Sequence, residues 1–345
     1  MSNNYMKPNQ LKIAVVGLGS IGLPLLEVLA DKHFVVGVDL NTKLKTRFLT
    51  YKKIPKGMDV VIICTPERAV PDLVYLADLY NTPNIIIRST MPIGSSSKLL
   101  GRLHNSRLFY APERSLEGKI KEEIDKIPQL VAGHDKDAVN FLLSIFFKAP
   151  GIIYKDNFLE VEAAKLISNA YRYLQFTTSN ILYNACSKHN LDFYAVNDLA
   201  AQGYNRMGQL SSAGYVGGPC LPKDLEHLLG SQDSLKDSLF EVNKQLTKNV
   251  VNKAMSQLKE NKLVGIYGLT MKKDSPDTRG AWATVLEKEL LGRNENITIV
   301  KYDPFLHHQE GLSLIEQCDV VIIATPHSQA SELNHTNIID VWSFK

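Results

Sequence analysis

The chain has 345 residues, of which 44% are hydrophobic, and its 39 Lys and Arg residues nearly balance 36 Asp and Glu residues. This length predicts two domains with a linking element, and a balanced charge without basic, aromatic-rich clusters argues against a nucleic-acid partner. No apolar run approaches the roughly 20 residues of a membrane span, and the polar start MSNNYMKPNQ lacks a signal-peptide core. We therefore expect a cytoplasmic protein without a membrane partner.

Residues 1–154 alternate short apolar runs with helical patterns. A helix is predicted over residues 21–30, and strands are predicted at residues 12–16, 34–40, 59–66, 84–90 and 107–113. Strands that alternate with helices indicate a parallel sheet covered by helices. The pattern predicts an α/β domain over residues 1–154.

A glycine-rich turn stands between the first strand and the first helix. Gly17, Gly19 and Gly22 form G-x-G-x-x-G, and Asp39 ends the second strand 22 residues after Gly17. The glycines permit a tight turn, a close pyrophosphate and close helix packing, and the acid suits a ribose 2′-hydroxyl while repelling a 2′-phosphate. The pattern predicts NAD rather than NADP. Ser20 and Ile21, inside the same turn, are included among the predicted cofactor-binding residues.

Residues 155–258 are mostly helical, and one helix is predicted from about residue 157 to 189. Four polar residues share one face of this helix at steps of three, four and three: Glu162, Lys165, Asn169 and Arg172. They form either a solvated stripe on an amphipathic helix or a group that polarises a substrate oxygen.

A loop rich in glycine and proline, AGYVGGPCLPKD at residues 213–224, interrupts the helical region. We expect neither regular helix nor strand in it, because its glycines free the backbone and its prolines fix it on both sides of Cys220. A single cysteine in such a loop is either an inert packing residue or a reactive thiol. No pair among the four cysteines has metal-ligand spacing, so we expect no metal site.

Residues 259–345 return to strands, predicted at residues 262–270, 296–305 and 319–327. DVVIICTPE at residues 59–67 and DVVIIATPH at residues 319–327 share seven of nine residues. The repeat predicts two similar halves, which we interpret as two Rossmann-like doubly wound α/β domains joined by a central helical region. The second half has only GIYGLT where the first has its glycine triplet, so we expect it to bind something other than a dinucleotide.

Six motifs together resemble the UDP-glucose/GDP-mannose dehydrogenase family, the nucleotide-sugar 6-dehydrogenases. They are GLGSIGLP, RSTMPIGS, APERSLEG, EAAKLISNAYR, GYVGGPCLPKD and GLTMKKDSPDTRGAWA. They occur in family order, and the resemblance extends over nearly the whole chain. The resemblance implies an NAD-dependent four-electron oxidation of the C6 hydroxyl of a UDP-sugar to a uronic acid, through a thiohemiacetal and a thioester on Cys220, as in polysaccharide biosynthesis.

The resemblance also implies roles for individual residues. Lys165 stabilises oxyanions, Asn169 and Asp224 position the hydrolytic water, Glu113 is an acid/base candidate, and Thr90 assists through a water. Further contacts implied are Thr65, Thr90 and Arg279 to the cofactor, and Glu113, Lys165, Asn169, Arg206, Gly217 and Lys272 to the substrate. Arg206 resembles an arginine that reaches the partner subunit's site, which implies a homodimer.

Substrate choice stays open. Arg114, which follows the Pro-Glu pair where the UDP-glucose branch has an aromatic residue, favours a UDP-N-acetylhexosamine such as UDP-N-acetylmannosamine or UDP-N-acetylglucosamine over UDP-glucose. The alternatives to the family activity are a two-electron β-hydroxyacid-type dehydrogenase and a non-catalytic NAD-binding relative. The chain departs from the family in a shortened 40–58 segment, a slightly short Arg206–Cys220 spacing and an early C-terminus, which puts the adenosine pocket and the substrate loop in question.

Overall fold

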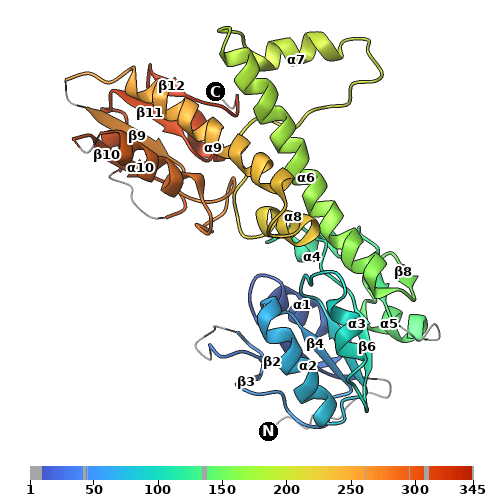
Figure 1. Ribbon diagram of the computed structural model, residues 1–345. Coiled ribbons are helices and arrows are strands. Elements are labelled where there is room, and N and C mark those ends of the chain that lie inside the picture. The colour runs from blue at the N-terminus through green and yellow to red at the C-terminus, as the bar shows by residue number, and fades with distance from the viewer. Residues whose placement is uncertain are drawn as a thin grey trace. The chain divides into compact units, whose positions relative to one another are not determined.

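The computed structural model describes residues 10–41, 44, 46–133, 138–260, 262–294, 296–306 and 311–343 (Figure 1). The chain divides into two compact units, residues 1–166 and 167–345. The finer division into domains of 1–154, 155–258 and 259–345 stays a prediction.

The first unit is an α/β unit built on one large sheet. Its elements are β1 (Lys12–Val16), α1 (Gly22–Leu29), β2 (Phe34–Val38), β3 (Thr50–Tyr51), β4 (Val60–Ile63), η1 (Glu67–Ala69), α2 (Val70–Leu79), β5 (Asn84–Ile87), α3 (Ser95–Leu100), β6 (Arg107–Tyr110), α4 (Ile120–Glu123), β7 (Gln129–Ala132), α5 (Val139–Ile145), β8 (Ile152–Lys155) and the start of α6 (Phe158–Ser187).

The strands of the first sheet lie in the order β3-β2-β1-β4-β5-β6-β7-β8. From β3 to β6 all neighbours are parallel, and the order reverses between β1 and β4, which is the doubly wound arrangement with its switch point beside β1. β7 is antiparallel to β6, and β8 extends the sheet beside β7. The sequence did not predict β7 and β8.

The buried strands explain why the first sheet forms. Residues of β1, β4 and β5 are β-branched or alanine almost throughout, and their side chains are fully buried on both faces of the sheet. Such continuous apolar runs are typical of parallel strands covered by helices on both sides. The helices α1 and α2 supply the apolar faces that pack on them, through Leu25, Leu26, Val70 and Val74.

The second unit combines helices with a smaller sheet. Its elements are the rest of α6, α7 (Phe193–Ala201), α8 (Leu221–Leu229), α9 (Ser234–Met255), β9 (Leu263–Tyr267), α10 (Trp282–Arg293), β10 (Thr298–Tyr302), α11 (Gly311–Ile315), β11 (Val320–Ile323), η3 (Ser328–Glu332) and β12 (Ile338–Ile339). All four strands are parallel, in the order β10-β9-β11-β12. The predicted fold class, parallel α/β sheets with a long connecting helix, is confirmed.

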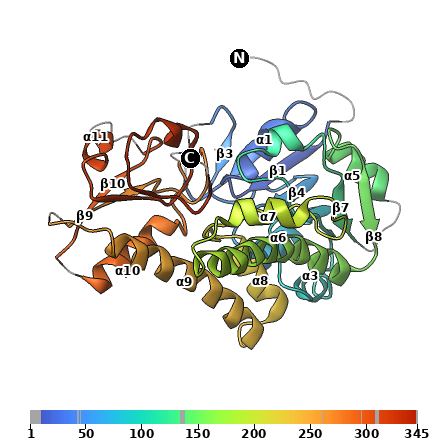
Figure 2. The same cartoon turned by 90° about the horizontal axis from the view of Figure 1, so that it is seen from above.

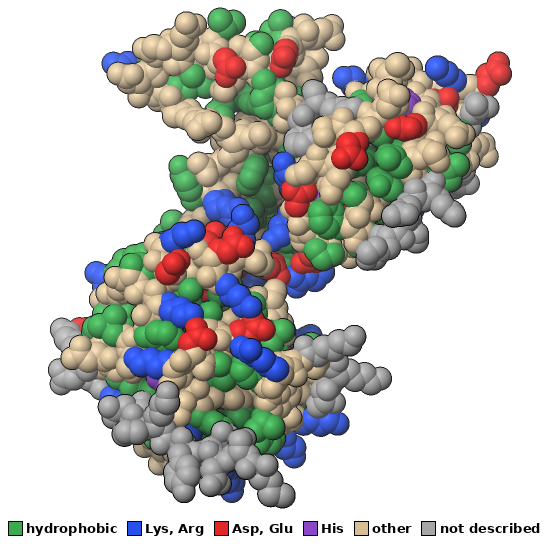
Figure 3. All heavy atoms as spheres, turned by 180° about the vertical axis from the view of Figure 1, so that it is seen from behind, with side chains coloured by type: hydrophobic (Ala, Val, Ile, Leu, Met, Phe, Trp, Pro, Cys, Tyr) green, Lys and Arg blue, Asp and Glu red, His purple; other side chains and the backbone are tan. Residues whose placement is uncertain are grey.

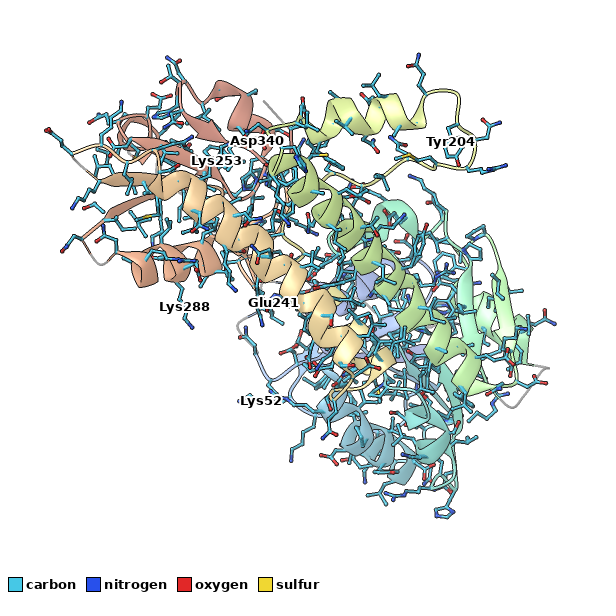
Figure 4. The ribbon with its side chains drawn as sticks, turned by 45° about the horizontal axis from the view of Figure 1, so that its top comes forward. Lys52, Tyr204, Glu241, Lys253, Lys288 and Asp340 are labelled. Carbon is cyan, nitrogen blue, oxygen red and sulfur yellow. The ribbon has the colours of Figure 1, made fainter. Side chains whose placement is uncertain are left out.

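The helix α6 begins in the first unit and ends in the second, and its 30 residues match the predicted helix. Within the second unit α9 runs beside it (Figure 2), and the Asn249 amide on α9 donates to the Asn184 amide oxygen on α6 at 2.9 Å. Beyond the C-terminal end of α6, α7 and the segment after it, which carries Tyr204, project as an arm (Figure 4).

One prediction about the glycine- and proline-rich loop was wrong. Residues 213–220 are irregular, but α8 already begins at Leu221, so residues 221–224 are helical. Pro222 falls in the first turn of this helix, where a proline is tolerated because its missing N–H would have no helical partner.

Among the described residues, no helix is both long enough and apolar enough to span a membrane. On the face seen in Figure 3, Lys and Arg side chains of the first unit lie interspersed with Asp and Glu.

Candidate functional site

The glycine turn forms as predicted between β1 and α1. Gly17 has φ +88°, and a Cβ there would lie 2.9 Å from the Cys64 carbonyl oxygen and the Thr65 methyl group. A Cβ on Gly22 would overlap the Gly17 carbonyl oxygen, so this glycine lets α1 pack against the turn. A Cβ on Gly19 would meet nothing within 4 Å. Only Gly19 thus leaves open space above its backbone, as a pyrophosphate would require.

The carboxylate of Asp39 is fixed at the end of β2. Its Oδ2 accepts the Leu18 N–H at 2.7 Å and its Oδ1 accepts the Asn41 N–H at 2.8 Å. Each carboxylate oxygen has a second lone pair, so Asp39 can still accept a ribose hydroxyl. The turn residues Ser20 and Ile21 complete this edge; Ser20 is exposed and Ile21 half-buried.

Two threonines follow neighbouring strands at the same edge of the sheet. Thr65 follows β4 and Thr90 follows β5, and the Ser89 hydroxyl donates to the Thr65 carbonyl at 2.5 Å. The Thr65 hydroxyl is buried and has no hydrogen-bond partner within the described chain. The structure therefore brings the predicted cofactor residues of the first unit together around the switch point.

Glu113, which follows β6, is a buried and fully engaged carboxylate. The Arg88 guanidinium donates to Oε2, and the backbone N–H groups of Arg114 and Ser115 each donate to Oε1 at 2.8 Å. Burial alone would raise the pKa of Glu113, but the Arg88 charge and these hydrogen bonds outweigh it and lower the pKa to about 2. The group is therefore held as a carboxylate that can accept hydrogen bonds.

Arg88 is a functional candidate that the sequence reasoning missed. It is 1% exposed, donates to the Ala111 carbonyl at 2.9 Å and to Gln129 Oε1 at 2.7 Å, and lies over the Phe146 ring. The signal available was its place directly after a strand, at the start of RSTMPIGS.

The polar stripe on α6 is not a solvated face. Glu162 is fully buried and accepts the backbone N–H groups of Gly94 and Ser96 at 2.6 and 2.7 Å, so it caps α3. Lys165 is 9% exposed, whereas Arg172 is exposed. The stripe therefore divides into a structural residue, two candidates for chemistry at Lys165 and Asn169, and one surface residue.

The glycines of the Cys220 loop are required by close packing. A Cβ on Gly214 would overlap the Trp342 ring, and a Cβ on Gly217 would overlap the Gly280 carbonyl oxygen. Gly218 has φ +79°, and its N–H donates to that same carbonyl at 3.2 Å. The loop is thereby fixed where it leads into α8.

Cys220 is exposed and is the N-cap residue of α8. The N-terminus of a helix carries a partial positive charge that favours an anion, such as a thiolate. Two other cysteines differ: desolvation raises the pKa of Cys64 to about 12 and that of Cys318 to about 11. Cys220 is the cysteine suited to act as a nucleophile.

Asp224 lies one turn after Cys220 and is 1% exposed. Its Oδ2 accepts the Asn169 amide at 2.6 Å, which joins α8 to α6. Its Oδ1 accepts no hydrogen bond within the described residues, and the Lys223 ammonium lies 3.7 Å away. The structure brings together Asn169 and Asp224, both predicted to position the hydrolytic water, and a buried acceptor remains for a water or substrate group.

The loop that follows β9 meets the Cys220 loop. It carries Lys272, half-buried, and Arg279, exposed and paired with Asp277 at 2.6 Å. Its Gly280 carbonyl accepts the Gly218 N–H, so the two loops are joined by a backbone hydrogen bond. The predicted substrate residue Gly217 lies at this junction.

Arg206 is placed apart from these loops. It lies exposed on the arm after α7, with its guanidinium 6.0 Å from the centre of the Tyr204 ring.

A model of the UDP-glucose/GDP-mannose dehydrogenase family, central domain, matches residues 160–250. The chain is similar to UDP-N-acetyl-D-mannosamine dehydrogenase of Methanococcus aeolicus, with 26% identity over 96% of this chain and 88% of the relative. It is also similar to UDP-glucose 6-dehydrogenase of Campylobacter jejuni, with 28% identity over 84% of this chain and 78% of the relative.

Solved structures share the fold. A UDP-D-ManNAc dehydrogenase from Pyrococcus horikoshii gives a TM-score of 0.85 at 23% identity, covering 97% of this chain and 96% of the other. A UDP-glucose dehydrogenase from Pyrobaculum islandicum gives 0.84 at 20% identity, covering 99% and 96%. Residues 160–250 thus match the central domain of the UDP-glucose/GDP-mannose dehydrogenase family, and the chain is similar along most of its length to UDP-sugar dehydrogenases, whose fold it shares.

Proposed function

We propose that the protein is an NAD-dependent nucleotide-sugar 6-dehydrogenase that oxidises the C6 hydroxyl of a UDP-sugar to the uronic acid. The observation that carries the proposal is Cys220, exposed at the N-terminus of α8 and one turn from the paired Asn169 and Asp224. When bound, NAD accepts the hydride of each oxidation, so that the alcohol, two NAD⁺ and one water give the carboxylate, two NADH and three protons.

The first oxidation removes the hydroxyl proton as the C6 hydride leaves. Glu113, the acid/base candidate, is held as a carboxylate by Arg88, so it fits the role of accepting a hydrogen bond from the hydroxyl or from a water that takes up the proton. Thr90, at the end of the neighbouring strand β5, fits the role of positioning that water. The product of this step is the C6 aldehyde.

Cys220 then captures the aldehyde. Its thiolate sulfur bonds to C6, and the carbonyl oxygen gains the charge and then a proton, which gives a thiohemiacetal. Loss of the second hydride from C6 and of the hydroxyl proton leaves a thioester. The covalent bond keeps the aldehyde in the site, so the second oxidation follows without release.

Lys165 and the Asn169–Asp224 pair fit the remaining steps. A lysine ammonium stabilises the oxyanions that form on C6 as the thiolate and later water attack. The free acceptor of Asp224 can hold the attacking water, whose oxygen bonds to C6 while the C–S bond breaks and the thiolate returns. The product is the carboxylate.

Cofactor and nucleotide contacts follow from the two sheets. Asp39 supports NAD over NADP because a 2′-phosphate would face a carboxylate already held in place. Thr65 and the glycine turn complete the cofactor contacts in the first unit. We assign Lys272 and Gly217 to the nucleotide sugar, and Arg279 to the cofactor or to a contact between domains.

A free thiol at Cys220 requires a reducing compartment, which we take to be the cytoplasm.

A homodimer is supported by an apolar stripe on α6. Ile167, Tyr171, Leu174 and Ile181 are 53, 60, 41 and 50% exposed and recur at steps of four, three and seven residues on one face of the helix. Such a stripe favours burial against a second copy of the same helix. In that dimer Arg206, on the arm after α7, would complete the partner's site.

The substrate branch is proposed from the relatives and from Arg114. The archaeal relatives are named for UDP-N-acetyl-D-mannosamine and the Campylobacter relative for UDP-glucose. We favour a UDP-N-acetylhexosamine, because Arg114 stands where the UDP-glucose branch has an aromatic residue.

The test is the amount of NADH formed per sugar nucleotide consumed, run to completion with UDP-N-acetylmannosamine, UDP-N-acetylglucosamine and UDP-glucose. Two NADH per sugar on one of them are expected, and Cys220→Ser should form no uronate while still binding NAD. One NADH per sugar in the wild type would contradict the thioester route and favour a two-electron dehydrogenase. NAD binding without NADH on any nucleotide sugar would favour a non-catalytic relative.

Subunit mixing tests the dimer. Inactive Arg206→Ala and inactive Cys220→Ser subunits should regain up to about a quarter of the wild-type activity after exchange, because one of two sites in each mixed dimer is intact. No recovery despite verified exchange would place Arg206 outside the partner's site.

A further inference from the structure

The backbone that leads into Cys220 is held by hydrogen bonds at Gly214, Val216 and Gly218. Asn180 on α6 holds Gly214 twice, accepting its N–H at 2.7 Å and donating to its carbonyl at 2.8 Å. Asn243 on α9 holds Val216 in the same way, at 2.9 and 2.8 Å. Between them the Tyr215 ring stacks on Trp282, with the ring planes 3° apart.

The Trp342 ring packs directly against the backbone of this loop. It lies against Gly214 so closely that a Cβ there would overlap it. The ring is itself held: its Nε1–H donates to the Ile323 carbonyl at 3.1 Å, and it meets the Trp282 ring edge-on at 6.2 Å.

The segment around Trp342 is also fastened. Asp340, which lies beside the C-terminal end of α6 (Figure 4), accepts the Trp342 N–H at 2.8 Å. The Val341 carbonyl accepts the Tyr194 hydroxyl of α7 at 2.7 Å. Trp342 therefore has its own fixed position and is not carried along by the loop.

We propose that Trp342 is a positioning residue for the nucleophile. By packing against Gly214, its ring fixes the path of the backbone from Gly214 to Gly218 and so the position of Cys220 at the start of α8. The inference rests on the proposed function, because the position of the thiol matters most if it must capture the aldehyde. Displacing a reacting atom by about 1 Å can cost about 100-fold in rate.

A misplaced thiol has a consequence that simple loss of stability does not have. The first oxidation needs no thiol, so it continues, whereas capture of the aldehyde by sulfur slows. Unfolding lowers the number of active molecules but leaves each at two NADH per sugar. The ratio of NADH to sugar thus separates positioning from stability.

The experiment compares three variants in the full chain. Trp342→Ala removes the ring and should lower the ratio from two toward one, with free aldehyde found by mass spectrometry. Trp342→Phe keeps a ring against Gly214 and should retain a ratio close to two. Val341→Ala is the control. The Val341 side chain is buried in the apolar cluster formed by α9, α10, β9 and β11, so the variant should keep the ratio at two despite lower stability.

A second measurement does not depend on the sugar. The rate at which iodoacetamide alkylates Cys220, followed on its peptide, should fall several-fold in Trp342→Ala and stay within twofold in Val341→Ala. Because Cys220 is already exposed, a looser loop would make the thiol hardly more accessible to the reagent. It would, however, displace the sulfur from the helix N-terminus that favours the reactive thiolate, so alkylation should slow.

The outcomes keep the two proposals apart. If the wild type forms no NADH, the proposed function fails, and the alkylation rates alone decide the role of Trp342. If folded Trp342→Ala forms two NADH per sugar and is alkylated at the wild-type rate, Trp342 is only a core residue and the inference is overturned.

Discussion

The sheets of the two units share the same arrangement of backbone and carboxylate hydrogen bonds at the end of their first strand. Gly17 after β1 and Gly268 after β9 have φ +88° and +84°, and each donates its N–H at 2.8 Å to the last residue of the next strand, Val38 or Tyr302. The carboxylates after those strands, Asp39 and Asp303, accept the N–H of the residue after each glycine, at 2.7 and 2.6 Å. The sequence repeat at residues 59–67 and 319–327 therefore reflects a repeated structure.

The two units differ where ligands would bind. Glu67 in the first copy of the repeat is replaced by His327 in the second, and His327 is fully buried. Its Nε2–H points to Asp303 Oδ2 at 3.0 Å, and its Nδ1 accepts the Asp274 N–H at 2.9 Å, which assigns the neutral tautomer.

Under the proposed function, this difference lets the same arrangement of strands serve two ligands. Asp39 can still accept a hydrogen bond from a ribose hydroxyl. Asp303, by contrast, is buried and already accepts a hydrogen bond from the His327 ring. The second unit also lacks a glycine triplet, and its loop 269–281 replaces the close turn into a helix. Under the same proposal, the second unit binds the nucleotide sugar through this loop, with Lys272.

The largest effects are expected at the shared glycines. Gly17→Ala and Gly268→Ala each place a Cβ against backbone atoms in a left-handed conformation, and each should destabilise its own unit by about 3–5 kcal/mol. Calorimetry should show one transition lowered in each variant. Gly17→Ala should also abolish NAD binding, and Gly268→Ala should spare it. A single effect common to both variants would show that the units do not respond independently.

The next prediction compares the free energy of unfolding after substitution at equivalent positions of the repeat, Glu67 in the first copy and His327 in the second. His327→Ala leaves the buried Asp303 without its partner and should lower the free energy of unfolding of the second unit by about 3 kcal/mol. Glu67→Ala, at the same position of the first copy, changes a residue that is only half-buried and should lower stability by less than His327→Ala does. Urea unfolding measures both, and equal effects would contradict the comparison.

A pH dependence should distinguish the first unit. Burial disfavours the Glu113 carboxylate, but Arg88 lowers its pKa to about 2, below the usual value of about 4.3. A depressed pKa gives stability that is present above the unfolded value and lost as pH falls through the folded one. The free energy of unfolding should fall by up to about 1.4 kcal/mol per pH unit between pH 4.3 and 2.

Glu113→Gln, although less stable at neutral pH because Arg88 stays buried, should show a shallower slope in this range. The same slope in both proteins would mean that other carboxylates govern acid unfolding. Asp303 also has a lowered pKa, because hydrogen bonds from His327, Phe305 and Leu269 outweigh its burial, so the variant should retain the acid dependence of the second unit.

The sequence predicted the parts of the fold that local pattern determines. The apolar and β-branched runs predicted β1, β2, β4, β5 and β6 of the first sheet and β9, β10 and β11 of the second, and the glycine spacing located the turn after β1. The helix α6 followed from a long stretch without proline or glycine. Each signal lies within a few residues of the element it describes.

Other features depend on residues far apart in the chain. Glu162 seemed one of four polar residues on a helix face, but it caps α3, whose N–H donors lie 66 and 68 residues earlier. Arg88 and Glu113 are 25 residues apart and meet only because β5 and β6 are neighbours. β7 has only one β-branched residue, and β8 alternates half-buried and exposed residues at the end of the sheet, so neither shows the continuous apolar run of a buried strand. Residues 42, 43 and 45 of the shortened segment lie outside the described chain.

A small effect on stability is expected at Gly19, which belongs to the glycine triplet that the second unit lacks. Because a Cβ there meets nothing within 4 Å and its φ is not positive, Gly19→Ala should change the free energy of unfolding by less than about 1 kcal/mol. The added methyl group would stand where a pyrophosphate approaches the backbone, so NAD affinity should fall by about tenfold or more while UDP binding is unchanged. Calorimetric titration with each ligand measures the split. Because Gly17→Ala loses NAD binding together with stability, Gly19→Ala is the variant that isolates ligand approach from folding. Unchanged NAD affinity in a folded Gly19→Ala protein would mean that the dinucleotide does not cross this turn, and that the glycine triplet serves only to pack α1 against β1.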